Sequence, residues 1–111
     1  MADPHFAPDH ATARSMFLEA ASAAGGHLEI LDPGVKGPSD ETLAIDLAWF
    51  GSETPRRVLL HSSGLHGVEG FAGSAIQCRY LKGRLNVPDD GALVFAHVLN
   101  PHGMAWLRRV N

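Results

Sequence analysis

The chain has 111 residues, of which 45% are hydrophobic and 19% charged, and its formal net charge is -3. This length allows one domain with a modest core, and the composition is that of a globular rather than a disordered protein. The negative charge balance and the lack of a Lys/Arg stripe exclude a nucleic-acid surface of the usual basic kind. No stretch approaches the roughly 20 apolar residues of a membrane span.

The single cysteine, Cys78, excludes an internal disulfide and indicates a reducing compartment. It falls in a predicted helix without a neighbouring base, so we interpret it as a buried structural thiol. The N-terminus carries an acid where a signal peptide needs basic residues, and no apolar run follows. The sequence therefore predicts a cytoplasmic protein without a membrane or nucleic-acid partner.

Residues 1–56 predict a helix followed by a pair of strands. The helix runs from Asp9 to Ala24, ends at two glycines, and places apolar residues on one face: Met16, Phe17, Ala20 and Ala24. His5 and His10 precede or open this helix, and both are expected to be solvated. The strands, His27 to Leu31 and Leu43 to Phe50, are expected to be antiparallel neighbours near a sheet edge, with Asp46 on the exposed side.

Residues 57–99 predict a βαβ unit. An apolar strand from Val58 to His61 is expected to be buried on both faces. A helix from Gly70 to Lys82 follows, and small residues in its first turns allow close packing on the sheet. The last strand, Ala92 to Leu99, is again nearly all apolar. A strand, helix and strand with this spacing form a parallel pair. The predicted fold is thus an α/β fold with about four strands and two main helices.

The loop after the first strand of this unit contains His66 and Glu69 between three glycines. In open α/β sheets, ligands bind in the crevice beyond the carboxyl ends of the strands. An imidazole and a carboxylate at this place could share a zinc ion. The alternative is a surface histidine beside a glutamate that the helix macrodipole favours. The residues by themselves leave both interpretations open, because chance alone often produces a His-x-x-Glu pair.

A second motif begins where the other parallel strand ends. Asn100-Pro101-x-Gly103 predicts a turn, since proline fixes φ at a value that suits a turn and glycine adopts the backbone conformation at its end without steric cost. This turn would direct Arg108 and Arg109 towards the same crevice, where a guanidinium can bind a carboxylate or stabilise an oxyanion. No Gly-x-Ser-x-Gly elbow surrounds the serines of the first loop, and no Lys-Ser/Thr follows its glycines.

Together the runs His61-Ser-Ser-Gly-Leu-His-Gly-Val-Glu-Gly-Phe-Ala-Gly-Ser-Ala75 and Leu99-Asn-Pro-His-Gly-Met-Ala-Trp-Leu-Arg-Arg-Val-Asn111 resemble the DUF2817 family, which belongs with the zinc carboxypeptidases of the M14 type. The resemblance covers residues 57–111. It implies a zinc-carboxypeptidase-like mixed sheet and a zinc cofactor with His66 and Glu69 as the first two ligands. It also implies that the second motif leads to a substrate- or oxyanion-binding arginine, for which Arg109 is preferred over Arg108.

The sequence also departs from that family pattern. The resemblance implies a later Asp-Leu-Asn-Arg type segment, a third zinc ligand and a general-base glutamate, none of which occurs before Asn111. We therefore expect residues 1–111 to be the N-terminal portion of a single M14-like domain, with no general base of its own, no turnover, and an incomplete sheet edge open to self-association. The expected substrate of the intact enzyme is a small peptide or an acylated amino acid.

Two alternatives remain open beside the carboxypeptidase interpretation. One is an M14-like deacylase that acts on N-acyl amino acids. The other is a non-catalytic structural fragment in which the glycine loop is only a tight strand-to-helix turn.

Overall fold

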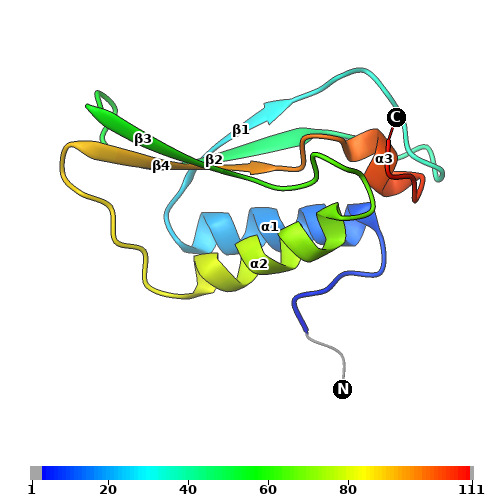
Figure 1. Cartoon of the computed structure of the whole chain (residues 1–111), viewed down its shortest axis with the longest axis horizontal. Coiled ribbons are helices and arrows are strands. Elements are labelled where there is room, and N and C mark those ends of the chain that lie inside the picture. The colour runs from blue at the N-terminus through cyan, green and yellow to red at the C-terminus, as the bar shows by residue number, and fades with distance from the viewer. Residues whose placement is uncertain (1–3, 111) are drawn as a thin grey trace.

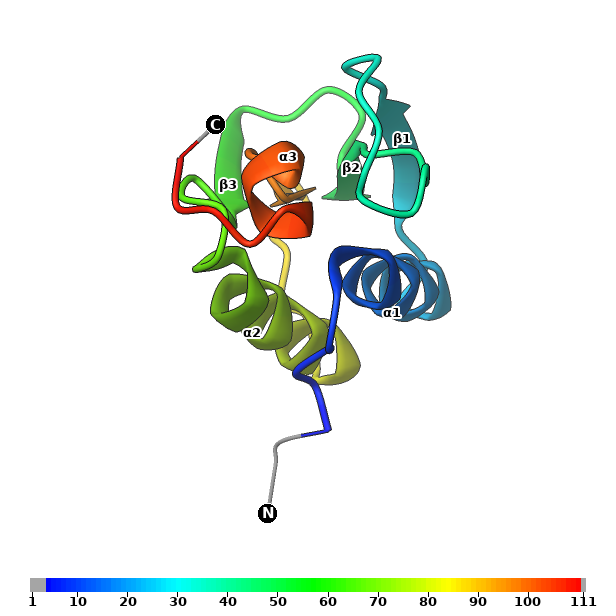
Figure 2. The same ribbon diagram turned by 90° about the vertical axis from the view of Figure 1, so that its right-hand side faces the viewer.

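The chain forms a four-stranded mixed sheet with two helices packed against one of its faces (Figures 1 and 2). This is a computed structural model that describes residues 4–110. Its elements are α1 (His10–Ala23), β1 (His27–Leu31), β2 (Ile45–Gly51), β3 (Arg57–Ser62), α2 (Gly70–Lys82), β4 (Gly91–His97) and α3 (Pro101–Ala105). The predicted mixed α/β architecture is confirmed, and α3 adds one short helix after the carboxyl end of β4.

The strands lie in the order β1-β2-β4-β3. β1 pairs antiparallel with β2, as predicted, and β2 pairs antiparallel with β4. β3 and β4 are parallel and are connected through α2, which confirms the βαβ unit. Because β3 and β4 run in the same direction, the loops that follow them lie at the same end of the sheet.

The first helix begins and ends close to the predicted residues. The side chain of Asp9 caps it by accepting the Thr12 amide at 2.7 Å, and Gly25 with φ +85° follows its end. The expectation that His10 is solvated is wrong, since only 2% of it is exposed. The first turn of α1 lies over the sheet, and the buried face consists of His10, Ala13, Phe17, Ala20 and Ala21.

The second strand turns its charged residue inwards. We expected Asp46 on the exposed side, but its exposed fraction is 0%. Side chains of a strand alternate between faces, and Asp46 shares its face with the buried Ala48 and Phe50, which pack towards the helices. The carboxylate is tolerated there because Arg14 of α1 donates to both of its oxygens, at 2.8 and 3.1 Å.

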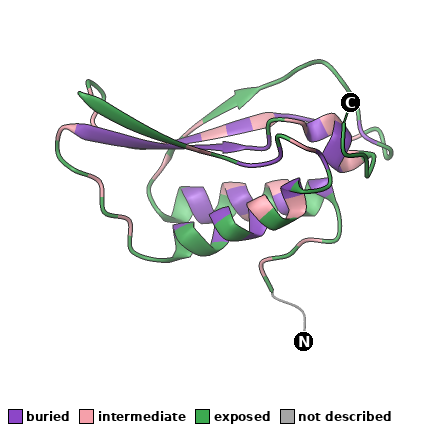
Figure 3. Cartoon of the chain, viewed as in Figure 1, coloured by how far each residue is buried: buried purple, intermediate pink, exposed green. Residues whose placement is uncertain are grey.

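β3 is an edge strand, and this corrects the expectation that it is buried on both faces. Its residues Val58, Leu59 and Leu60 are 53%, 66% and 60% exposed. β4 lies between β2 and β3, so every residue of β4 is buried (Figure 3). Both strands are apolar, and hydrophobicity alone does not indicate which of two parallel strands is central.

The core lies between the sheet and the helices α1 and α2. Its buried members are Phe17, Ala20, Ala21, Ala48, Phe50, Cys78, Leu81, Leu93 and Phe95. Cys78 is 1% exposed, in agreement with a structural thiol, and burial raises its pKa. Between residues 4 and 110, no helix is both long and apolar enough to cross a membrane.

Candidate functional site

The loop that carries His66 and Glu69 connects the end of β3 to the start of α2. Its residues 63–69 are called here the His66 loop. The segment that follows β4 extends the parallel pairing into this loop, because the Leu99 amide donates to the Ser63 carbonyl oxygen and the Asn100 amide to that of Gly64, both at 2.8 Å. The two loops at the carboxyl ends of β3 and β4 therefore start side by side, as the βαβ unit predicts.

After β4 the chain forms a capped helical turn rather than the simple turn that we predicted. Asn100 is the N-cap of α3, and its side-chain oxygen accepts the Gly103 amide at 2.9 Å. Pro101 occupies the first helical positions, where a missing amide hydrogen costs nothing. The Arg108 amide then bonds to the Gly103 carbonyl oxygen at 2.7 Å, which turns the chain back.

The returning chain docks on the His66 loop through its backbone. The Gly67 amide donates to the Arg109 carbonyl oxygen at 2.8 Å, and the Val68 amide donates to that of Arg108 at 3.0 Å. Residues 100–109 are called here the docked segment. The two sequence motifs, separated by about 30 residues of chain, thus form one structural unit.

Glycines allow this close approach. A Cβ atom at Gly67 would overlap the backbone of Gly103 and the carbonyl oxygen of Arg108. One at Gly70 would lie 2.9 Å from the sulfur of Met104, which is fully buried. The loop therefore carries glycines because α3 and the chain after it lie directly against the backbone of these residues.

Two charged side chains of the unit meet at its surface. Nε of Arg109 lies 3.6 Å from Oε1 of Glu69, and these side chains are 68% and 57% exposed. His66 is half-buried in the same loop. Arg108 contributes its backbone to the docking, and its side chain is exposed. The structure thus brings Arg109 and Glu69 together and places His66 three residues from Glu69 in the same loop.

Glu69 is not used as a helix cap. It occupies the N-cap position of α2 in helical conformation, and its side chain makes no capping hydrogen bond. A carboxylate at a helix N-terminus still gains from the macrodipole, so the alternative interpretation of Glu69 stays open. The carboxylate remains accessible for the guanidinium of Arg109 or for a cation.

The donor atoms of the loop fit zinc in type. A neutral imidazole and a carboxylate are both common ligands of this ion. Their number is smaller than a catalytic site needs, since such a site has three protein ligands and an open position. Over residues 4–110, no three His, Cys, Asp or Glu side chains are grouped so that they could hold a metal ion. Residue Asn111, which closes the second motif, lies outside the described residues.

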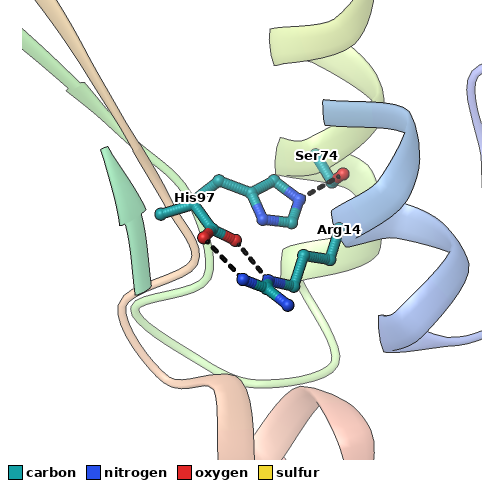
Figure 4. A network of polar contacts seen from close by, with 4 residues as sticks. Arg14, Ser74 and His97 are labelled. Atoms are coloured by element: carbon teal, nitrogen blue, oxygen red, sulfur yellow. Dashed lines mark hydrogen bonds and ion pairs between the residues drawn. The ribbon is translucent and has the colours of Figure 1, made fainter. Parts of the chain in front are cut away.

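A polar network that the sequence did not predict lies between α1, α2 and the sheet (Figure 4). It combines the Arg14–Asp46 pair with a hydrogen bond of 2.8 Å between Ser74 Oγ and His97 Nε2. Asp46 and His97 are directly opposite in the β2–β4 register. The exposed fraction of His97 is 0%, and burial lowers its pKa to about 3.

The buried side chain of Gln77 connects α2 to the two parallel strands through hydrogen bonds. The side-chain amide of Gln77 donates to the carbonyl oxygens of His61 and Ala96, both at 3.1 Å. Its oxygen accepts the hydroxyl of Ser63 at 2.8 Å. The only signal in the sequence is a glutamine among the small and apolar residues of the predicted helix, and that does not identify its partners.

Comparison with known proteins identifies the family. Residues 6–111 match the family described as "Protein of unknown function (DUF2817)", and the chain belongs to that family. No curated protein matches the sequence.

Two solved structures resemble the chain. The glutaminyl cyclase of Fimbriiglobus ruber superposes with a TM-score of 0.54 at 11% identity, over 82% of this chain and 37% of that enzyme. The glutaminyl cyclase of Porphyromonas gingivalis gives a TM-score of 0.49 at 15% identity, over 87% and 41%. The chain thus spans about two fifths of the length of these enzymes, and the first similarity shows a shared fold.

Proposed function

We propose that this member of the DUF2817 family is part of a zinc-dependent hydrolase of peptide or amide bonds, related to the M14-type carboxypeptidases. In this proposal His66 and Glu69 are two zinc ligands, and Arg109 binds substrate, with Arg108 as the second choice. The observation that supports it best is the docking of residues 100–109 on the His66 loop. That contact joins the only two motifs that carry the family resemblance and brings the arginine to the glutamate.

Each side chain has a definite task in this proposal. Bound zinc would supply an acidified water molecule and polarise the scissile carbonyl group. The imidazole of His66 and the carboxylate of Glu69 would hold the ion. Arg109 presents a planar guanidinium that can bind the terminal carboxylate of a substrate through two parallel hydrogen bonds. Its present contact with Glu69 at 3.6 Å is longer than a hydrogen bond and exposed, so exchanging it for a substrate carboxylate costs little.

The third zinc ligand and the general base would have to come from outside residues 4–110. The proposal therefore treats residues 1–111 as the N-terminal portion of a larger catalytic domain, with residues 1–56 as a helix and strand pair and residues 57–111 as the zinc-loop unit. The small share of the glutaminyl cyclase length that the chain spans is compatible with this division. The 111 residues are expected to bind zinc weakly and to show no turnover.

Zinc uptake of purified protein tests the ligand assignment. We expect equilibrium dialysis against increasing zinc concentrations to show weak zinc binding by the wild-type chain and loss of that binding in the double variant H66A/E69A. The matched control is H27A/E29A, because His27 and Glu29 form an exposed pair at 3.6 Å on β1, far from the loop. Equal zinc content in all three proteins would favour the non-catalytic fragment. Circular dichroism of each variant verifies that it is folded.

Substrate class requires the protein encoded by the complete reading frame. An in-frame continuation after codon 111 that carries Asn-Arg, a histidine and a glutamate would support the larger enzyme. That protein is then assayed against peptides with free C-termini and against N-acyl amino acids, which separates a carboxypeptidase from a deacylase. Peptides with N-terminal glutamine belong in the panel, because the fold is shared with a glutaminyl cyclase. A chelator should abolish activity on the true substrate, and a chelator-resistant activity would contradict the proposal.

A further inference from the structure

Two histidines are buried between the helices and the sheet without the partners that a charged imidazole needs. His10 is 2% exposed and His97 is 0% exposed. Within residues 4–110, both ring nitrogens of His10 and Nδ1 of His97 have no hydrogen-bond partner. A neutral imidazole tolerates this environment better than an imidazolium, whose added charge and N–H group would both be unsatisfied.

The groups around the two rings compensate only in part for an added proton. On α1, Arg14 lies near both histidines and Asp9 precedes His10, and Glu41 faces His10 from the loop before β2. Asp46, Glu41 and Asp9 each raise the pKa of His10, but Arg14, which donates to both oxygens of Asp46, lowers it. From α2, His97 receives only the uncharged hydroxyl of Ser74. Desolvation is accordingly the largest effect on both rings, and it lowers the pKa of each.

The same two residues hold α1 against the sheet. His10 is the first residue of α1, and the ring of Phe17, two turns later, stacks on His97 with centroids 4.6 Å apart. A proton on either ring would place a positive charge in the contact between α1 and β4. This buried charge could be solvated only if water reached the rings, and that requires separation of α1 from the sheet.

The contact continues from α1 to the His66 loop. Ala13 of α1 packs with Val98 and Met104 in a second buried cluster. Val98 lies directly against Gly64, and Met104 lies against Gly70. A displacement of α1 would therefore remove the support under both ends of the loop.

From this arrangement we propose that His10 and His97 form an acid-sensitive switch: protonation releases α1 from the sheet and thereby disorders the His66 loop. The neutral pair keeps α1 and the loop in place near pH 7. The switch uses no metal and would operate whether or not the loop binds zinc.

The sign and size of the effect follow from proton linkage. Because the pKa of His97 is about 3 in the folded chain and ordinarily near 6.5, opened states bind more protons as the pH falls below 6.5. For one such histidine the ratio of open to closed chain rises roughly 25-fold between pH 7 and pH 5. His10 adds to this in the same direction. The ordinary pKa of a carboxylate lies near 4, below this range.

Hydrogen exchange at pH 7 and pH 5, corrected for intrinsic rates, tests the switch. We expect amides of residues 10–23 and 63–70 to lose about 25-fold in protection, while those of residues 92–95 in central β4 keep theirs. The variant H97Q should remove most of this pH dependence, and the control H27Q, at an exposed position on β1, should leave it unchanged. Unchanged protection of α1 at pH 5, or an equal loss throughout the chain, would overturn the proposal.

A second measurement does not depend on a folded variant. Nitrogen-15 spectra of the imidazole rings in the wild-type chain report the charge of each histidine directly. We expect the resonance of His97 to remain that of a neutral ring down to pH 5 in the closed chain. A charged His97 in closed chain at pH 5 would contradict the switch.

Discussion

The close approach at Gly67 leads to a quantitative prediction for the variant G67A. A methyl group there overlaps backbone atoms of Gly103 and Arg108, which cannot move aside as a flexible side chain could. The φ angle of Gly67 is not in the left-handed region, so the expected effect comes from the overlap and not from backbone strain. The docked segment must therefore shift away from the loop.

The structure sets the size of this effect. Separation of the segment breaks the two backbone hydrogen bonds from the amides of Gly67 and Val68, at about 0.5 to 1.5 kcal/mol each. The exposed pair between Arg109 and Glu69 adds little after solvent screening. If the segment stays docked instead, overpacking costs about 1 to 3 kcal/mol. Both routes give a loss near 2 kcal/mol, or a decrease in Tm of roughly 8 °C or more for a domain of this size.

Calorimetry measures the Tm, and hydrogen exchange shows whether the amides of Gly67 and Val68 lose protection. The matched control is G83A, because a Cβ atom at Gly83 finds its nearest neighbour at an ordinary 3.4 Å. We expect the control to stay within about 0.5 kcal/mol of wild type. If G67A melts with the wild-type Tm and keeps both amides protected, the contact between the docked segment and the His66 loop does not stabilise the loop.

Three further changes test other parts of the structure. The variant D46N should destabilise the chain by about 2 to 4 kcal/mol in urea titrations, since it leaves the charge of Arg14 unpaired against the sheet; a loss below 1 kcal/mol would contradict this. Replacing Gln77 with Met should cost about 2 to 4 kcal/mol, because hydrogen-bonding groups in β3 and β4 lose their partner; a neutral result would show that water replaces it. If the edge of β3 mediates self-association, the variant L59K/L60K should elute as a smaller species than wild type in size-exclusion chromatography, and identical elution would exclude that edge.

Local patterns in the sequence correctly predicted several elements. The helix Gly70–Lys82 and the strand His27–Leu31 have the predicted bounds, and the parallel pairing of the strands around the helix is confirmed. These features depend on periodicity, on end signals and on short connections, all of which lie within a few residues of each other. The position of His66 and Glu69 in the loop after an apolar strand was predicted for the same reason, because it is a local property.

Contacts between distant residues explain where prediction failed. Asp46 was expected to be exposed because a carboxylate in a strand normally faces water, but its partner Arg14 lies 32 residues earlier. His10 was expected to be solvated because it opens a helix near the N-terminus, and only the packing of that helix on β2 and β4 buries it. The burial of a polar side chain depends on its partners, and a sequence does not specify which distant residues these are.

The sequence by itself determined the four strands and the two main helices of this protein, the parallel strand pair, and the end of the sheet at which its two motifs lie. Tertiary structure alone decided that β3, and not β4, is an edge strand and that residues 100–109 dock on the His66 loop. The physical reason is that strand order and docking depend on which surfaces fit against each other. At Gly67 the backbone of the docked segment occupies the space that a side chain would need. The reason for a glycine at this position is therefore apparent only from the tertiary structure.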